Sequence, residues 1–395
     1  MASLNEIKHE AEDVIDEFSD ELKDLSYRIH ENPEISYEEF EASELLTGEL
    51  ENLGFSVERG IAGLETAFRG TYSVDEEEPK ICLMVECDAL KDLGHAAGHN
   101  LSGVSSIGAA IAVRQMMEDH DLDGELVVMG TPAEEMGGAK ADMVEAGLFD
   151  DVDAAMSVQM FDKTVLDPKF IALNGVRFTF HGKPAHAAGA PEVGINALNG
   201  VIQTFQNIDS LRQHVREEVR MHGIITDGGA AVNIVPETAQ ATFFIRAPRL
   251  DYLSEVMEKV KNCARGAALA TGTELDIDCF ESIDDLTSNP VLVALFDENV
   301  SRYTKEMEAT TEEPVGSTDV GTVSKVVPTV NPMISITDER IPLHTKEFEE
   351  ASASEQGYEG MLTGAKALAL TALDLICEEG FLNRARQTFE EGIGG

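Results

Sequence analysis

His95-Ala96-Ala97-Gly98-His99-Asn100 lies shortly after the acidic residues Glu86 and Asp88, which in turn follow the apolar run 81–85. The apolar run predicts a buried strand, and open α/β sheets bind ligands beyond the carboxyl ends of such strands. Imidazole nitrogen and carboxylate oxygen are ligands that suit zinc, cobalt and manganese. The stretch therefore predicts a catalytic metal centre; the alternative is a pair of histidines that only cap or hydrogen-bond a turn.

A second stretch, Thr131-Pro132-Ala133-Glu134-Glu135, follows the strand-like run 125–129. Neighbouring side chains in an extended loop point in opposite directions, so one glutamate can bind a metal while the other addresses the bound water. Metal-assisted hydrolysis needs this division of labour, because a carboxylate must take the proton of the water and pass it to the leaving amine. Taken alone, the pair could also be a solvated acidic turn, but beside the two histidines it favours the metal interpretation.

Hydrophobic periodicity predicts alternating helices and strands in the first part of the chain. Apolar residues recur at three- and four-residue steps over residues 4–31, so a single helix is expected up to Asn32-Pro33, and a second helix ends near Gly54. Asn100 or Ser102 is expected to cap the helix after the histidine stretch. Strands are expected at 56–58, 65–69, 80–86, 125–129 and 155–159. This order predicts an α/β fold with a largely parallel, doubly wound sheet.

The pattern changes at about residue 169. Strands are expected at 170–173, 176–180, 219–225, 238–246 and 274–279, with helices at 195–214 and 252–270. Two helices among antiparallel strands predict a ferredoxin-like α+β domain inserted into the first domain. The expected boundaries are therefore 1–168 for the first part of the α/β domain, 169–285 for the insert and 286–395 for the second part, which ends in a helix at 359–377.

The composition indicates a globular protein with an extremely acidic surface. The chain has 395 residues, 43% of them hydrophobic, and a formal net charge of −45, with the acidic residues dispersed along the sequence. Dispersed carboxylates with few lysines are typical of proteins adapted to high salt, where screening removes self-repulsion. We expect a salt-loving source and no binding to nucleic acid or to anionic membranes, which such a surface repels.

The five cysteines have no framework spacing, which predicts free thiols in a reducing compartment. The N-terminal segment lacks the basic and apolar regions of a signal peptide, and no apolar run reaches the roughly 18 residues of a membrane span. We therefore expect a soluble, cytoplasmic protein that has no membrane partner.

The motifs, in their order along nearly the whole chain, resemble the M20 family of metallopeptidases and amidohydrolases. The similarity is to its amidohydrolase branch, which includes aminoacylases and p-aminobenzoyl-glutamate hydrolase-like proteins. The motifs are His30-Glu31-Asn32-Pro33-Glu34, Glu86-Cys87-Asp88-Ala89-Leu90, Gly94-His95-Ala96-Ala97-Gly98-His99-Asn100, Pro132-Ala133-Glu134-Glu135, Gly182-Lys183-Pro184-Ala185-His186-Ala187, Asn233-Ile234-Val235-Pro236, Ser317-Thr318-Asp319 and Pro342-Leu343-His344-Thr345. The resemblance implies a zinc-peptidase-like catalytic domain with an inserted dimerisation or lid domain, and a homodimer.

For the catalytic domain, the resemblance implies that Glu134 is the general base and that His99, Glu135 and His344 are metal ligands. For the insert, it implies that His186 reaches the active site of the partner subunit and stabilises the oxyanion.

Asn233 and Arg246, also on the insert, resemble residues that position the substrate or its carboxylate, a role that suits an arginine fork. Alternative roles are a surface ion pair for Arg246 and a structural turn for His186.

The chain departs from the pattern at two ligand positions. The branch usually has a ligand cysteine where this chain has Ala97, and a ligand histidine where it has Gln159. The three remaining ligands plus water make a competent catalytic zinc site, so one ion is expected rather than two. Zinc and manganese are the expected metals, with cobalt as a third candidate, and His95 or Asp88 is a candidate substitute ligand.

The expected function is metal-dependent hydrolysis of the amide bond of a small molecule: an N-acyl amino acid, a dipeptide or a p-aminobenzoyl-glutamate-like compound. The alternative is a catalytically impaired homologue that binds an amino-acid-like ligand or serves as a scaffold homodimer, because two usual metal ligands are replaced.

Overall fold

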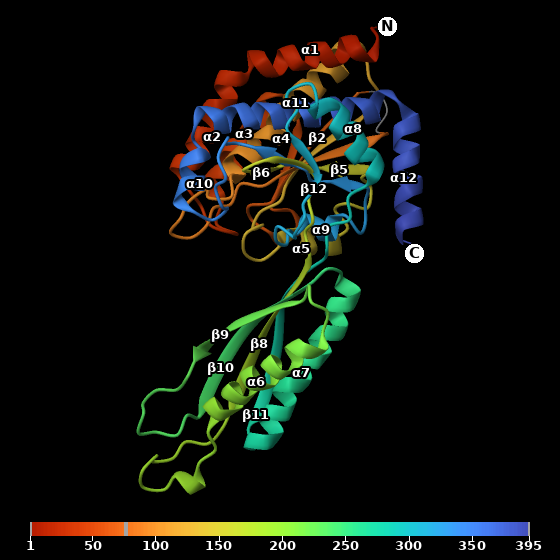
Figure 1. The fold of residues 1–395 in the computed structure, drawn as a ribbon. Coiled ribbons are helices and arrows are strands. Elements are labelled where there is room, and N and C mark those ends of the chain that lie inside the picture. Colours follow the sequence, from red (N-terminus) through yellow and green to blue (C-terminus); the bar gives the residue numbers. More distant parts are fainter. Residues whose placement is uncertain (1, 75–77, 394–395) are drawn as a thin grey trace. The chain divides into compact units, whose positions relative to one another are not determined.

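The computed structural model describes residues 2–74 and 78–393 (Figure 1). The chain divides into two compact units. Unit 1 comprises Met1–Lys169, Leu286–Val315 and Asp319–Gly395, and unit 2 comprises Phe170–Asp285 and Gly316–Thr318.

The central sheet of unit 1 has the strand order β1-β2-β4-β3-β5-β13. Its strands are β1 (Ser56–Arg59), β2 (Phe68–Val74), β3 (Lys80–Val85), β4 (Gly124–Gly130), β5 (Ala154–Met156) and β13 (Thr329–Val330). β4, β3, β5 and β13 run parallel, whereas β2 is antiparallel to β4 and β1 is antiparallel to β2. The predicted doubly wound sheet is therefore parallel except at one edge, where β1 and β2 are antiparallel strands.

A second sheet of unit 1 has the order β12-β7-β14-β6. Its strands are β6 (Gln159–Phe161), β7 (Thr164–Asp167), β12 (Met307–Thr310) and β14 (Met333–Ser335). The single strand expected at 155–159 is thus two strands, because the chain leaves β5 in the central sheet and pairs again with β14 as β6.

Helix α4 (His99–His120) lies in the core of unit 1, between the central sheet and helix α11 (Glu355–Cys377). Gly98, with φ +79°, precedes α4 and offers it no side-chain cap. The expected cap at Asn100 or Ser102 is wrong, because both residues lie inside α4. The buried side chain of Asn100 instead donates hydrogen bonds to Ser26 Oγ (3.0 Å) and the carbonyl of Ser352 (2.9 Å).

The helix expected over residues 4–31 is divided into α1 (Leu4–Glu17) and α2 (Ser19–Glu31) by Phe18, whose ψ of 6° is not helical. The C-terminal helix α12 (Glu379–Ile393) was not expected. The other helices of unit 1 are α3 (Phe40–Asn52), the 3-10 turn η1 (Ile61–Gly63), α5 (Ala139–Glu145), α8 (Pro290–Val300), α9 (Val320–Val323) and α10 (Lys346–Ala351).

One helix among the described residues, α11, is long and apolar enough to cross a membrane by length and composition alone. Lys366 and Asp374 interrupt its apolar sequence, so it is not an unbroken apolar run of this length. Of its most apolar window, 72% is buried inside the protein, as in a core helix.

Unit 2 has the order β8-α6-β9-β10-α7-β11 along the chain and the strand order β11-β8-β10-β9, all antiparallel. Its elements are β8 (Ala172–His181), η2 (Pro191–Val193), α6 (Ala197–Leu211), η3 (Arg212–His214), β9 (Arg220–Asp227), β10 (Thr238–Ala247), α7 (Leu250–Thr271) and β11 (Glu274–Ile283). Every second residue of β10 is buried, and α6 and α7 lie side by side against the sheet (Figure 1). This is the predicted ferredoxin-like arrangement, with one long strand β8 where two were expected.

Candidate metal centre

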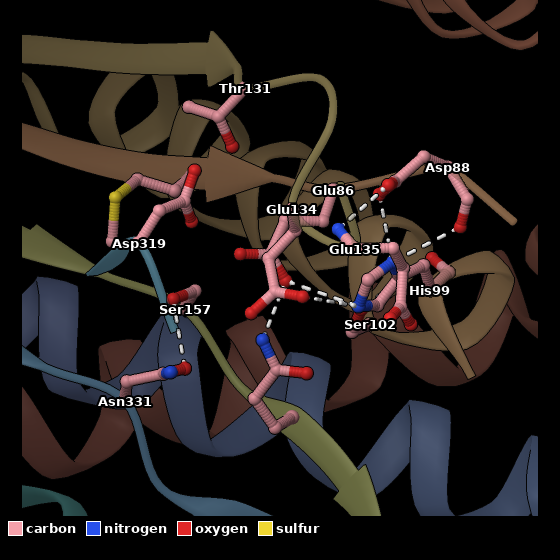
Figure 2. A network of polar contacts seen from close by, with 12 residues as sticks. Glu86, Asp88, His99, Ser102, Thr131, Glu134, Glu135, Ser157, Asp319 and Asn331 are labelled. Atoms are coloured by element: carbon pink, nitrogen blue, oxygen red, sulfur yellow. Dashed lines mark hydrogen bonds and ion pairs between the residues drawn. The ribbon is translucent and has the colours of Figure 1, made fainter. Parts of the chain in front are cut away.

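Polar side chains gather where the parallel strands of unit 1 end. Glu86 follows β3, Glu134 lies in the loop after β4, Ser157 follows β5 and Asn331 follows β13 (Figure 2). Because the carboxyl ends of parallel strands share one edge of the sheet, side chains far apart in sequence converge there.

His99 begins α4 and is held by Asp88. Its Nδ1 atom lies 2.9 Å from Asp88 Oδ1 and 3.0 Å from the carbonyl oxygen of Asp88. Its Nε2 atom faces two carboxylates, Glu86 and Glu134, each at 3.8 Å (Figure 2). The bond to Asp88 fixes the ring so that Nε2 is presented to the cluster, as expected of a metal-binding histidine.

The electrostatics of this pair follow from its burial. Burial works to lower the pKa of His99, but the hydrogen bond and the charge of Asp88 prevail and hold this pKa well above its usual value. Burial works to raise the pKa of Asp88, but the bonds from His99 and from the Glu135 N–H lower it to about 2. These bonds therefore favour the ionised carboxylate of Asp88.

Two glycines let the start of α4 pack closely against β6 and the end of β3. Gly98 takes a left-handed backbone conformation at φ +79°, and a Cβ atom there would lie 2.7 Å from Met160 Cβ. A Cβ atom at Gly103 would lie 2.2 Å from the carbonyl oxygen of Glu86. Only glycine fits at this contact between the helix and the end of β3.

Glu134 and Glu135 lie in a loop that is anchored on both sides. The Ala133 N–H donates to Glu39 Oε1, and the Glu135 N–H donates to Asp88 Oδ2, both at 2.9 Å. Candidate ligand atoms of His99, Glu134 and Glu135 all lie within 4.8 Å of one another. The sequence-predicted base and two of the predicted ligands are thus brought together.

The carboxylates of this cluster are short of hydrogen-bond partners. Glu135 Oε1 is buried and has no partner among the described residues. Burial raises the pKa of Glu135 to about 7, and burial together with the charge of Glu86 raises the pKa of Glu134 well above its usual value. A bound cation would relieve both effects, so the donor set fits a divalent metal.

His344 approaches the cluster from the last part of the chain. Its N–H donates to the carbonyl of Ala96 at 3.0 Å, and its backbone has φ +60°. Its Nε2 atom lies 3.5 Å from Glu135 Oε2, and about half of the side chain (54%) is exposed. Burial, with a smaller contribution from the charge of His99, lowers the pKa of His344 and so favours the neutral imidazole that binds metals.

The two candidate substitute ligands have other contacts. His95 Nε2 lies 3.1 Å from the carbonyl of Ile29, and its ring stacks on His30. Asp88 Oδ1 contacts Nδ1 of His99, and Asp88 Oδ2 accepts hydrogen bonds from the Ser36 hydroxyl and the Glu135 N–H. Neither residue belongs to a candidate metal-binding group among the described residues, and neither does His344. The hypothesis that His95 or Asp88 is a substitute ligand stays a prediction, and the contacts of Asp88 suit a residue that orients His99.

A second acidic group adjoins the first and was not given a role from the sequence. Ligand atoms of Glu86, Glu134 and Asp319 lie within 4.8 Å of one another. Lys140 Nζ lies 2.7 Å from Glu86 Oε1 and 2.6 Å from Asp319 Oδ1, and Gln159 Nε2 donates to Glu86 Oε2 at 2.6 Å. Glu86 and Asp319 belong to two of the motifs that resemble the M20 family, but nothing in the sequence indicated that Lys140 is buried between them.

His186, Asn233 and Arg246 lie in unit 2. The exposed His186 accepts hydrogen bonds at Nδ1 from the N–H groups of Ala188 (3.2 Å) and Gly189 (3.1 Å). The carbonyl of Asn233 accepts from Ala187 N–H, which places it beside His186.

Arg246 Nη1 lies 3.2 Å from Ser317 Oγ, and its buried Nε has no partner among the described residues. Burial lowers the pKa of Arg246, which leaves a partly desolvated cation suited to an anion.

Comparison with known proteins identifies relatives along the whole chain. Residues 172–271 match the peptidase dimerisation domain of M20 proteins. The chain is 35% identical over 405 residues to the Xaa-Arg dipeptidase of Mus musculus, covering 98% of this chain and 93% of that protein. It is 27% identical to one of the subunits of the p-aminobenzoyl-glutamate hydrolase of Escherichia coli K12, covering 98% and 96%.

A solved structure from Bacillus subtilis, described as a dinuclear metal binding peptidase from the M20 family, has a TM-score of 0.67 at 18% identity and covers 91% of this chain and 99% of that one. This likeness concerns the fold. The predicted resemblance, the fold class and the assignment as a metal-dependent hydrolase are confirmed. The chain belongs to the M20 family of metal-dependent peptidases and amidohydrolases.

Proposed function

We propose that this protein hydrolyses the amide bond of a small substrate with one divalent ion, zinc or manganese with cobalt as a third candidate, held by His99, Glu135 and His344. One observation carries the proposal: ligand atoms of His99, Glu134 and Glu135 lie within 4.8 Å of one another, and a buried oxygen of Glu135 has no partner among the described residues. His344 is added to the ligands because its Nε2 atom lies 3.5 Å from Glu135 Oε2. Two histidines and one glutamate are an established ligand set for catalytic zinc, with the fourth position open for water.

The remaining residues have separate tasks in this proposal. A bound divalent ion would supply Lewis acidity, which lowers the pKa of water and polarises the scissile carbonyl. Glu134 takes the proton from the attacking water and delivers it to the leaving amine. Its position favours this role, because Glu134 Oε2 lies 3.8 Å from Nε2 of His99, beside the atoms that would hold the ion and its water. Asp88 keeps Nδ1 of His99 protonated, which leaves Nε2 as the ligand atom.

Unit 2 supports a homodimer and a role in catalysis. Its match to a dimerisation domain favours self-association. Two backbone N–H groups bind Nδ1 of His186, so the neutral ring carries its proton on the exposed Nε2. That N–H is the donor we assign to the oxyanion of the partner subunit's substrate. Arg246 and Asn233 are assigned to the substrate carboxylate and to its orientation.

Among amide substrates, we propose a dipeptide with a basic C-terminal residue. The relative at 35% identity is named for Xaa-Arg dipeptides. N-acyl amino acids are the next class to test. Five free cysteines support a reducing, cytoplasmic location.

The test is metal analysis joined to a substrate panel. The protein, purified in high salt, is stripped with chelator, reloaded with Zn²⁺, Mn²⁺ or Co²⁺, and analysed for bound metal and for hydrolysis of Xaa-Arg, Xaa-Lys, N-acyl and p-aminobenzoyl-glutamate substrates. About one ion per chain and preferred cleavage of basic dipeptides are expected. His99→Ala should lose both metal and activity, whereas His9→Ala, which alters an exposed histidine, should lose neither. A wild-type protein without metal at micromolar supply would refute the proposal.

A second candidate function has its own observation. Gln159, at the position of a usual ligand, donates a hydrogen bond to Glu86, so this side of the cluster is occupied by protein groups. A homologue that binds an amino-acid-like ligand without turnover would use the same cluster of side chains. Calorimetric binding of a dipeptide by metal-loaded protein, with no product formed over days, would favour this function.

A further inference from the structure

Lys140 is the only lysine among the fully buried large side chains of the described residues. It lies near the start of α5, after the loop that carries Glu134 and Glu135. Its ammonium contacts Glu86 at 2.7 Å and Asp319 at 2.6 Å, and its backbone N–H donates to the other oxygen of Asp319 at 3.2 Å. A lysine is this deeply buried only where carboxylates compensate its charge.

The cluster contains two adjacent cation positions that share Glu134. The first is formed by His99, Glu134 and Glu135, and the second by Glu86, Glu134 and Asp319. Two adjacent groups of ligand atoms are an arrangement in which hydrolases hold a pair of metal ions, and Glu134, the proposed base, borders both groups here.

The two positions differ in the state of their ligand atoms. At the first, Glu135 Oε1 has no partner among the described residues, and Nε2 of His99 has only contacts of 3.8 Å. At the second, both oxygens of Glu86 accept hydrogen bonds, from Lys140 and Gln159, and both oxygens of Asp319 accept from Lys140. The first position therefore has atoms available for a cation, whereas the donors of the protein already occupy the second.

We infer that the Lys140 ammonium takes the place of a second metal ion in this site. It supplies a positive charge to Glu86 and Asp319, which would otherwise repel each other and Glu134 in a buried environment. An ammonium group has no coordination position for water or substrate, so it neutralises and fixes the carboxylates without adding a second Lewis acid. The centre then holds a single exchangeable ion, at the first position.

This inference rests on the proposed metal centre and is tested by counting ions in variants that change only the second position. Lys140→Met keeps the length of the side chain and removes its charge. Bound Zn²⁺ or Mn²⁺, measured by mass spectrometry after gel filtration, should rise from about one to about two ions per chain. The Co²⁺ form should gain a second set of visible absorption bands. Neither measurement depends on activity.

Three control variants distinguish the loss of the Lys140 charge from a general disturbance of the fold. Lys140→Arg retains a cation and should stay at about one ion. Lys140→Met combined with Asp319→Asn removes a ligand with the lysine and should also stay at about one. Lys8→Met changes another buried, carboxylate-paired lysine of unit 1 and should not alter the count. If Lys140→Met is insoluble without metal, its recovery on refolding with excess Zn²⁺ or Mn²⁺, but not in buffer without added metal, supports the inference.

The outcomes distinguish this inference from the proposed function. If wild type binds no ion and Lys140→Met binds one, the proposed single-ion centre fails, whereas the replacement of a cation by Lys140 is supported. If wild type binds about two ions, metal-dependent hydrolysis stands, but the inference and the proposed single ion are overturned. An unchanged count in soluble Lys140→Met, or insolubility that metal does not relieve, overturns it as well.

Discussion

The carboxylate of Asp88 joins two proposed metal ligands: Oδ1 lies 2.9 Å from Nδ1 of His99, and Oδ2 accepts the N–H of Glu135 at 2.9 Å. One buried side chain thus fixes the direction of an imidazole and the course of the loop that carries a carboxylate.

Asp88→Asn should weaken metal binding by about 10–100-fold, because an amide of the same shape no longer enforces the Nδ1-protonated tautomer of His99. Competition with a chromogenic chelator measures this loss. Ser36→Ala, which removes only the hydroxyl bonded to Oδ2, is the matched control and should change affinity far less. Equal affinities for wild type and Asp88→Asn would show that this carboxylate does not orient the ligand.

Glu134→Gln should reduce kcat by about 10²–10⁴-fold while metal remains bound, because the amide cannot accept the proton of water. Glu135→Gln should lose metal, because it weakens a ligand. Parallel measurement of kcat and bound metal for both variants separates a base from a ligand. Loss of metal in the first variant with retention in the second would reverse the two assignments.

Gly103→Ala should destabilise unit 1 by about 3 kcal/mol or more, because its methyl group would lie 2.2 Å from the carbonyl oxygen of Glu86. Gly48→Ala in α3 is the control: nothing lies within 4 Å of the added methyl, so a gain of about 0.5–1 kcal/mol is expected. Urea unfolding in high salt measures both. Similar stabilities for the two variants would contradict the close approach of α4 to β3.

Ala97→Cys combined with Gln159→His should raise the affinity for metal or the number of bound ions, since both changes add ligand atoms near the cluster. The change at 159 also removes the hydrogen bond that occupies Glu86 Oε2. Titration with Zn²⁺ under anaerobic conditions, against each single variant, measures the effect. An affinity and count identical to wild type would mean that these positions do not face the ion.

The unfolding temperature should climb as KCl increases well into the molar range. A net charge of −45 makes the compact state repel itself, and at about 1 M salt the screening length falls to about 3 Å. Scanning fluorimetry over a KCl series, with sucrose as a neutral comparison, tests this. A flat or falling curve would refute adaptation to high salt.

The sequence was informative where local patterns suffice. The apolar run before Glu86 and the glutamate pair after β4 predicted strand ends with polar side chains, and the structure places them at one sheet edge. The break at Phe18 and the division between β5 and β6 were missed, because each depends on packing or pairing with distant segments.

Lys140 shows most clearly where sequence reasoning stops. Its partners lie 54 and 179 positions away in the sequence, so no local pattern indicates that an ordinary charged residue is buried between Glu86 and Asp319. From the sequence, Ala97 and Gln159 could be identified only as departures from the family pattern. That Lys140 and Gln159 donate hydrogen bonds to Glu86 could be seen only in the three-dimensional structure.

The interruption of unit 1 by unit 2 has a consequence for synthesis on the ribosome. β13 must pair with β5, and Asp319 and His344 must reach the cluster, only after residues 170–285 have emerged. Until then, the first part of unit 1 lacks the strand that pairs with β5 and the residues that contact its acidic side chains. The described strands of the insert form a sheet of their own, so the insert can fold first. During synthesis the edge of β5 that will pair with β13 therefore stays unpaired until the chain beyond the insert has been made.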